Sequence, residues 1–203
     1  MKVINDITPI ILIHIKFNKI LQFLYFVFNI FKHLKQLKFN MKKLKITLVL
    51  LVVATVTFAQ QSPRKQATGK IGTVAVEVDY GAPSVRDRVI WGELVPFGKV
   101  WRAGANENTT ISFDKDVTVG NQKVPAGKYG LFLIPNKGEH WIIALSKKND
   151  AWGSNGYSKE NDLIRLKVSP KKSDMSVEQM AFHVDKKGVK FAWEKVKVWI
   201  PIN

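Results

Sequence analysis

Cysteine is missing from the 203-residue sequence. Its absence excludes disulfide bonds, thiol catalysis, metal sites built on cysteine and a lipid-modified N-terminal cysteine. Histidine is scarce as well, because residues 60–203 contain only His140 and His183, which are far apart and form no His-Glu-x-x-His pair. The Gly-x-Ser-x-Gly motif of serine hydrolases is also missing. We therefore expect neither a metal site nor a cofactor.

Acidic residues are few relative to basic ones, and the formal net charge is +16. Residues 1–59 hold nine lysines and one aspartate (+8), while residues 60–203 hold 23 Lys and Arg against 15 Asp and Glu (+8). Beyond residue 60 the lysines are scattered, and only short pairs such as Lys147-Lys148 and Lys171-Lys172 cluster. This distribution is typical of a solvated basic surface. We therefore do not expect a nucleic acid as a partner.

A secretory signal peptide is predicted at residues 41–59. Met41 precedes a cluster of lysines, an apolar run covers residues 46–58, and the small residue Ala59 stands before a polar stretch. The apolar run is shorter than the ~20 residues that a membrane-spanning helix needs. We expect cleavage after Ala59 and a periplasmic or secreted protein, with the membrane involved only through this leader.

Residues 1–40 precede the predicted signal peptide, although a cleavable signal ordinarily stands at the N-terminus. We interpret them as an extension that results from a start placed too far upstream, with Met41 as the real initiator. The alternative is a membrane segment around residues 10–31 that tethers the protein through an uncleaved N-terminus. Lys16 and Lys19 would interrupt such a segment at an energetic cost.

The rest of the chain predicts a single all-β domain over residues 71–203, preceded by a linker or a frayed first strand at residues 60–70. In residues 73–80 apolar and polar side chains alternate, and this period of two indicates a half-buried strand. Similar short runs recur at residues 109–113, 116–119, 129–134, 141–146, 163–168, 179–184, 189–193 and 196–200. About nine short strands with turn residues between most of them predict an antiparallel β-sandwich or barrel.

Residues 81–108 interrupt this rhythm, and loops of more than about 12–15 residues inside compact domains are often functional. Residues 60–203 contain five arginines against 18 lysines, and three of the five arginines lie in this loop. A guanidinium can hold a carboxylate, a phosphate or a sugar hydroxyl in fixed geometry and can stack on an indole. The candidate ligand-binding residues are Arg88, Trp101, Arg102, Asn106 and Glu107, joined by two aromatic residues of a second polar loop, Trp152 and Tyr157.

The same loop also has a purely structural interpretation. Arg102 and Glu107 can pair and hold the long connection in place, while Trp91 and Trp101 cap the core. A separate segment, residues 114–116, has the two aspartates of a calcium loop but lacks its glycine and distal glutamate, so we interpret it as a turn.

Four stretches of the sequence carry a resemblance to a known family. They cover residues 78–83, 87–92, 94–107 and 125–132, and the Trp-Arg-x-Gly-Ala-Asn element in the third is specific. Through these stretches the chain resembles domain of unknown function 2911, a family of exported bacterial proteins, over most of residues 62–200. The resemblance implies a secreted or periplasmic β domain, and it implies no activity, substrate or cofactor.

These residues favour a non-enzymatic binding module of the cell envelope, whose partner is a small polar or anionic ligand or an envelope glycan. Arg88 and Arg102 would hold the ligand. Asn106 and Glu107 would orient it, and Trp101 would form an apolar wall. The second interpretation is an envelope hydrolase that uses Glu107 as acid or base beside Arg102, which we rank lower because no nucleophile or metal-ligand set is recognisable. The third is a domain whose loop network serves only the fold.

Overall fold

The computed structural model describes residues 20–32, 47–48 and 62–203, apart from residue 139. The chain divides into two compact units, Met1–Gln60 and Gln61–Asn203. In the first unit residues 20–32 are helical, and no helix within the described ranges is long and apolar enough to cross a membrane. The predicted signal peptide at residues 41–59 lies outside the described residues except for 47–48, so it stays a prediction.

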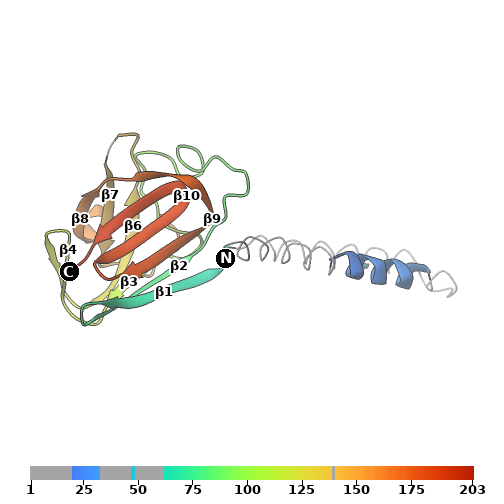
Figure 1. The fold of residues 1–203 in the computed structure, drawn as a ribbon, viewed down its shortest axis with the longest axis horizontal. Coiled ribbons are helices and arrows are strands. Elements are labelled where there is room, and N and C mark those ends of the chain that lie inside the picture. The colour runs from blue at the N-terminus through green and yellow to red at the C-terminus, as the bar shows by residue number, and fades with distance from the viewer. Residues whose placement is uncertain (1–19, 33–46, 49–61, 139) are drawn as a thin grey trace, which may run out of the picture. The chain divides into compact units, whose positions relative to one another are not determined.

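The regular structure of the second unit consists of antiparallel strands and one short 3-10 helix (Figure 1). In chain order its elements are β1 (Arg64–Ile71), β2 (Val74–Gly81), β3 (Thr110–Phe113), β4 (Val117–Val119), β5 (Gln122–Val124), β6 (Gly127–Ile134), β7 (Trp141–Ser146), the 3-10 helix η1 (Lys159–Asn161), β8 (Asp162–Val168), β9 (Lys171–Asp185) and β10 (Gly188–Pro201). The all-β prediction is therefore confirmed, and of the two predicted architectures the structure is the sandwich.

The larger sheet has the strand order β1-β2-β3-β6-β7-β8, and its neighbouring strands are antiparallel. Its inner face follows from the alternation seen in the sequence, because Val76, Val78 and Tyr80 of β2 are all at most 3% exposed. The sheet is open, with β1 and β8 at its edges.

The outer face of this sheet is covered at β6. Leu131 and Leu133 belong to the main core, so Phe132 between them points to the opposite face, where it is 1% exposed. Tyr157 packs on it with ring centroids 4.9 Å apart, and Val100 packs against the same small cluster. The two loops that the sequence singled out therefore contact the same outer face of β6.

The second layer consists of β9, β10 and the short β4–β5 hairpin. β10 bends sharply at Glu194, whose φ is +52°, so that its second half folds back beside its first half. Just beyond the two ends of the strand, Ile202 N donates a hydrogen bond to Lys187 O (3.1 Å). The chain end then pairs with β4, since Thr118 and Asn203 exchange two backbone hydrogen bonds of 2.8 and 2.9 Å. The C-terminal residues thus connect β10 to the β4–β5 hairpin.

The two layers share one apolar core with an aromatic cluster in it. Trp101 from the long loop stacks on Trp193 of β10, with centroids 5.5 Å apart and planes 19° from parallel. Trp91 lies edge-on to both rings at 5.9 and 5.8 Å and lies 4.6 Å from Trp141 of β7. These indoles join the long loop to both sheets.

The observed strands differ from the predicted ones where pairing is long-range. Residues 60–70 were expected to be a linker or a frayed first strand, but the backbone from Arg64 onward pairs with the whole length of β2. The linker interpretation is corrected for these residues. The strand β5 was not expected, and the runs at residues 189–193 and 196–200 belong to the single bent strand β10.

Candidate functional site

Residues 82–109 connect β2 to β3 and are fixed to the core at several points. Ile90 and Val95 are each 2% exposed, and Val95 N donates to Ile90 O (2.9 Å). The loop returns to the sheet at Trp101, whose backbone exchanges two hydrogen bonds of 2.8 Å with Leu133 of β6. Because both halves are anchored, this long loop is an ordered platform for side chains.

Close backbone contact shapes the element at residues 101–108. A side chain on Gly81 would overlap the carbonyl oxygen of Ala105, whose N–H donates to Gly81 O (3.1 Å). A Cβ on Gly104 would stand 2.6 Å from Thr109 Oγ1. The Gly104 carbonyl accepts a hydrogen bond from Trp101 Nε1 (3.1 Å). Glycine is required at both positions because two stretches of chain touch there.

A second loop, residues 147–158, is held against this element by hydrogen bonds. Asn108 N donates to Ala151 O, and Gly153 N donates to Asn106 O, both at 3.1 Å. The carboxamide of Asn108 is buried and satisfied when its nitrogen donates to Ala151 O (3.1 Å) and Gly153 O (2.7 Å). The long loop and the second loop, both predicted from the sequence to carry candidate residues, therefore form one continuous surface.

This ladder brings three of the predicted residues together. Trp152 lies opposite Glu107 in an isolated β-bridge. A Cβ on Gly153 would stand 3.7 Å from Arg102 Nη1, so the guanidinium lies beside the same turn. Trp152 is 65% exposed, and the side chain of Glu107 is 56% exposed. An indole, a carboxylate and a guanidinium thus meet at one surface.

Arg102 carries a charge that no side chain of the described residues balances by contact. Its Nε is buried without a hydrogen-bond partner, and no carboxylate of the described residues lies within ion-pair distance of its guanidinium. Burial lowers the pKa of this guanidinium from its ordinary value, and the Glu107 carboxylate partly offsets the effect. Arginine still keeps its charge. The Arg102–Glu107 ion pair of the structural interpretation is therefore not formed in the described domain.

Glu107 has a different partner, Arg64, which sequence reasoning did not identify. Arg64 Nη1 lies 3.7 Å from Glu107 Oε2, and its Nε lies 2.6 Å from Asp79 Oδ1. Arg64 Nη2 also donates to Asn108 O (2.9 Å). The pairing of β1 with β2 places Arg64 beside Glu107. No local sequence pattern predicts this contact.

Other candidate residues are engaged within the fold. Trp101 is 9% exposed and belongs to the aromatic core. Arg88 is exposed, but its guanidinium donates to Val85 O (3.1 Å) and Ser84 O (2.6 Å) and so closes its own turn. The amide of Asn106 donates to the backbone just before β1 (3.4 Å).

Tyr157 belongs to a polar cluster at the start of β8. Its hydroxyl donates to Asp162 Oδ2 (2.6 Å), and Arg165 Nη1 donates to the same carboxylate oxygen (2.7 Å) and to the Tyr157 hydroxyl oxygen. Burial and the hydrogen bond to Asp162 raise the pKa of Tyr157 to about 12, against an opposing effect of Arg165. The phenol is thus held protonated as a structural donor.

The raised pKa of Tyr157 predicts a loss of stability at high pH. The folded state favours the protonated phenol, so its contribution is complete below the ordinary pKa of about 10 and is lost as pH rises through about 12. Tyr157→Phe should remove this part of the pH dependence. The check is a phenolate absorbance titration of both proteins, and a difference between them that titrates near pH 10 would contradict the assignment. Taking the difference is necessary because burial also raises the pKa of Tyr129.

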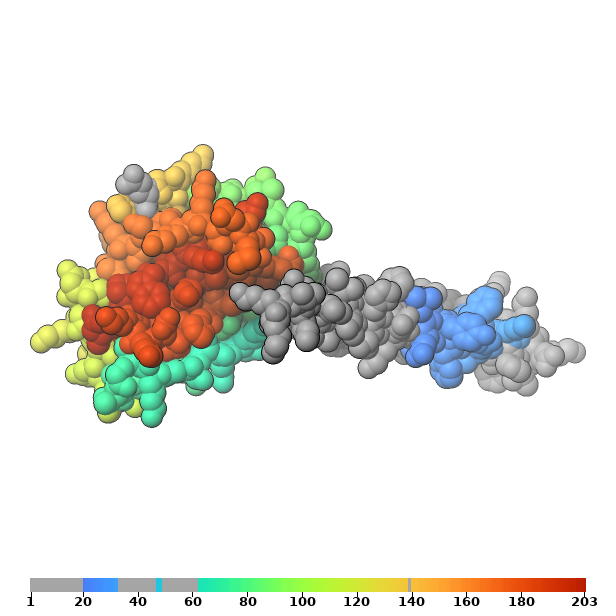
Figure 2. Space-filling model, in the orientation of Figure 1, coloured from blue at the N-terminus to red at the C-terminus, as the bar shows by residue number. Residues whose placement is uncertain are grey.

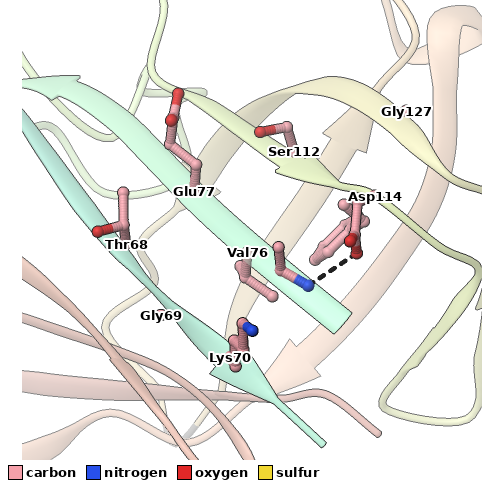
Figure 3. Close-up of a pocket in the computed structure, with 10 residues that line it drawn as sticks. Thr68, Gly69, Lys70, Val76, Glu77, Ser112, Asp114 and Gly127 are labelled. Atoms are coloured by element: carbon pink, nitrogen blue, oxygen red, sulfur yellow. Dashed lines mark hydrogen bonds between the residues drawn. The ribbon is translucent and has the colours of Figure 1, made fainter. Parts of the chain in front are cut away.

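A separate depression of about 540 Å³ lies across β1, β2 and β3 (Figure 3). The polar side chains in its wall are Thr68, Lys70, Glu77, Ser112 and Asp114. Figure 3 shows the Asp114 carboxylate turned to the backbone, where it accepts from Ala75 N (2.7 Å). Asp116 similarly accepts from Ala126 N (2.8 Å), so both aspartates stabilise turns. Within the described residues no three His, Asp or Glu side chains gather as a metal site.

Fold and site together define an all-β sandwich domain whose two docked loops present an arginine beside an exposed indole. The chain belongs to the family described as Protein of unknown function (DUF2911), whose model matches residues 62–202. The resemblance seen in the sequence is thereby confirmed, and the match coincides with the described β domain. No curated protein and no solved structure matches the chain.

Proposed function

We propose that this protein is a non-enzymatic binding module of the cell envelope that holds a small anionic ligand at Arg102. The observation that carries the proposal is the partly buried guanidinium with a buried, unbonded Nε and no carboxylate in contact among the described residues. An unsatisfied buried donor is costly, and a hydrogen bond between ions is stronger than a neutral one. A carboxylate or phosphate bound to the accessible part of the guanidinium would supply the counter-charge that Arg102 lacks.

The groups around Arg102 support the same role. Trp152 offers an exposed indole face against which an apolar part of the ligand can pack. Glu107 can accept a hydrogen bond from a hydroxyl group, and its neighbour Arg64 offsets the negative charge that would otherwise repel an anion. We leave Arg88, Trp101 and Tyr157 out of the contact set, because their polar groups are bonded within the fold.

The test is a thermal-shift screen of the purified protein against carboxylates, phosphates, sugars and nucleotides. A ligand at 100 times its Kd stabilises the folded state by about 2.7 kcal/mol, and we expect an anionic compound to do so. Arg102→Met should abolish the shift. Arg88→Met removes the same charge from an exposed turn of the same loop and should keep the shift. A screen without any shift, or equal loss in both variants, would contradict the proposal.

The same variant separates binding from a structural role. The Arg102 side chain makes no hydrogen bond or ion pair with the described residues, so Arg102→Met should lower the free energy of unfolding by no more than about 0.5 kcal/mol, and removal of the unsatisfied buried donor can raise it. A fall of several kcal/mol would favour the structural interpretation. Hydrolysis of a glycan by the wild-type protein that Glu107→Gln abolishes would favour the envelope hydrolase instead.

The envelope location rests on the predicted signal peptide at residues 41–59. We expect the mature protein, isolated from the periplasm or the medium, to begin at Gln60. N-terminal sequencing or peptide mass mapping checks this. A peptide from residues 1–40 in the exported protein would instead support the membrane-tethered alternative.

A further inference from the structure

A second candidate site lies on the face formed by β9 and β10, which is turned to the viewer in Figures 1 and 2. A depression of about 340 Å³ opens there, within the size range of small-molecule pockets. Its wall consists of Ser169, Lys171, Lys172, Lys190, Lys197, Val198 and Trp199. Lysines predominate in this wall, and it contains no acidic residue. We call this depression the lysine groove.

Folding gathers these lysines from separate parts of the sequence. Lys171 pairs with Lys197 in the register of β9 and β10. Lys190 and Trp199 stand on the two halves of β10, which meet because the strand folds back at Glu194. A groove with this composition is therefore a product of the bent strand and has no counterpart as a local sequence motif.

The ammonium groups of the groove form no ion pair within the part of the chain that the structure describes. Among the described residues none of Lys171, Lys172, Lys190 and Lys197 takes part in an ion pair. Positive charges gathered in one hollow repel each other and attract anions from solution. The groove is thus electrostatically complementary to a ligand that carries more than one negative group.

The groove also contains an aromatic platform. Trp199 is 37% exposed, and its ring lies directly on Gly188, where a Cβ would stand 2.8 Å from Trp199 Cζ2. The preceding residue, Val198, is 1% exposed in the core and fixes the strand beneath the ring. The indole is therefore held in place and keeps one part of its surface open to a ligand.

We propose that the lysine groove binds an acidic carbohydrate, whose sugar rings carry carboxylate or phosphate groups. The apolar face of a sugar ring would pack on Trp199, and its anionic groups would meet the surrounding lysines. A membrane surface fits less well, because membrane-bound faces insert apolar side chains, whereas this indole lies in a hollow walled by lysines. The site shares no residue with the Arg102 surface, and the inference does not depend on the proposed function.

The test measures binding of an acidic oligosaccharide, an oligouronate, to the purified full chain by titration calorimetry at low and high salt. We expect Lys171→Gln/Lys172→Gln to weaken binding at least tenfold and Trp199→Ala at least fivefold, with Trp199→Phe close to the wild type. The control Lys147→Gln/Lys148→Gln removes an equal charge from another exposed lysine pair and should change affinity less than twofold. Each titration is repeated in the Arg102→Met background, which removes carboxylate binding at the proposed Arg102 site, so that the effects of the groove variants are read without a contribution from that site.

Several results would overturn the inference. The first is no binding of the oligouronate, and the second is equal weakening of its binding by both lysine-pair variants. The third is an affinity for a neutral oligosaccharide of the same length, or for inorganic phosphate, that equals the affinity for the oligouronate. Binding to phosphatidylglycerol vesicles with no binding of the oligouronate would assign the groove to a membrane surface instead. All four substituted lysines are exposed, so both lysine variants should fold like the wild type. Their binding results therefore test the inference even if Trp199→Ala loses stability.

Discussion

Replacement of Trp101 by alanine is expected to lower the free energy of unfolding by about 4 kcal/mol. Trp101 is 9% exposed, stacks on Trp193 and lies edge-on to Trp91 and Phe191. The substitution removes these ring contacts and leaves a cavity where the long loop meets both sheets. It also removes the indole N–H that donates to Gly104 O, so that carbonyl loses its partner inside the fold.

Trp152→Ala is the matched control for this experiment. It deletes the same type of side chain from the second loop. Because Trp152 is 65% exposed, the free energy of unfolding should change by no more than about 0.5 kcal/mol. Urea denaturation of both variants, followed by far-ultraviolet circular dichroism, measures the two effects. Similar losses in the two variants would show that Trp101 is not the core residue described above.

Gly81→Ala is expected to cost about 3 kcal/mol, because an added methyl group overlaps backbone that cannot move without breaking hydrogen bonds. The Cβ would overlap the carbonyl of Ala105. Relief requires the loop to withdraw from β2, which breaks the bond from Ala105 N to Gly81 O (3.1 Å). Withdrawal would also displace Arg102 and Glu107, so the variant should lose ligand binding at Arg102 along with stability.

Gly138→Ala provides the comparison, because a Cβ at Gly138 meets nothing within 4 Å and its φ is not in the left-handed region. This variant should unfold at or slightly above the denaturant midpoint of the wild type, since alanine restricts the unfolded chain. The measurement is the same urea titration. A Gly81→Ala protein as stable as Gly138→Ala would show that the loop does not rest on β2 as described.

Trp101 and Trp152 show where sequence reasoning about the site reached its limit. Both are tryptophans in segments rich in small and polar residues, and both were candidates for ligand contact. Trp101 enters the core because its backbone pairs with Leu133 of β6, which aims the ring inward at Trp193. Trp152 stays at the surface because the ladder to Glu107 holds its loop outside the sheet. Exposure depended on pairing partners far away in the chain.

The charged residues show the same limit. Arg102 and Glu107 looked like natural partners because they are five positions apart in one loop, yet Glu107 faces Arg64 from β1. The segment that contains Arg64 was expected to be a linker or a frayed strand, because its own residues are polar and carry no clear alternation. Its conformation comes from the hydrogen bonds that the edge of β2 offers.

Local physics accounts for what the sequence determined by itself. Alternating apolar side chains indicated most of the strands, glycine and proline indicated the turns, and the length of residues 81–108 indicated the loop that meets the β6 face. Those features depend on neighbours within a few residues. They were enough to predict an all-β domain and the segment that holds the candidate site, whereas the family was identified from the four stretches that resemble it.

Only the tertiary structure decided which side chains share a surface. It left Arg102 without a counter-ion among the described residues, paired Glu107 with Arg64, and gathered four lysines around Trp199 through the bend of β10 at Glu194. Strand register and the packing of two sheets fix these contacts, and both depend on the summed burial of the whole core. A shift of one residue in a single strand would turn its side chains to the other face.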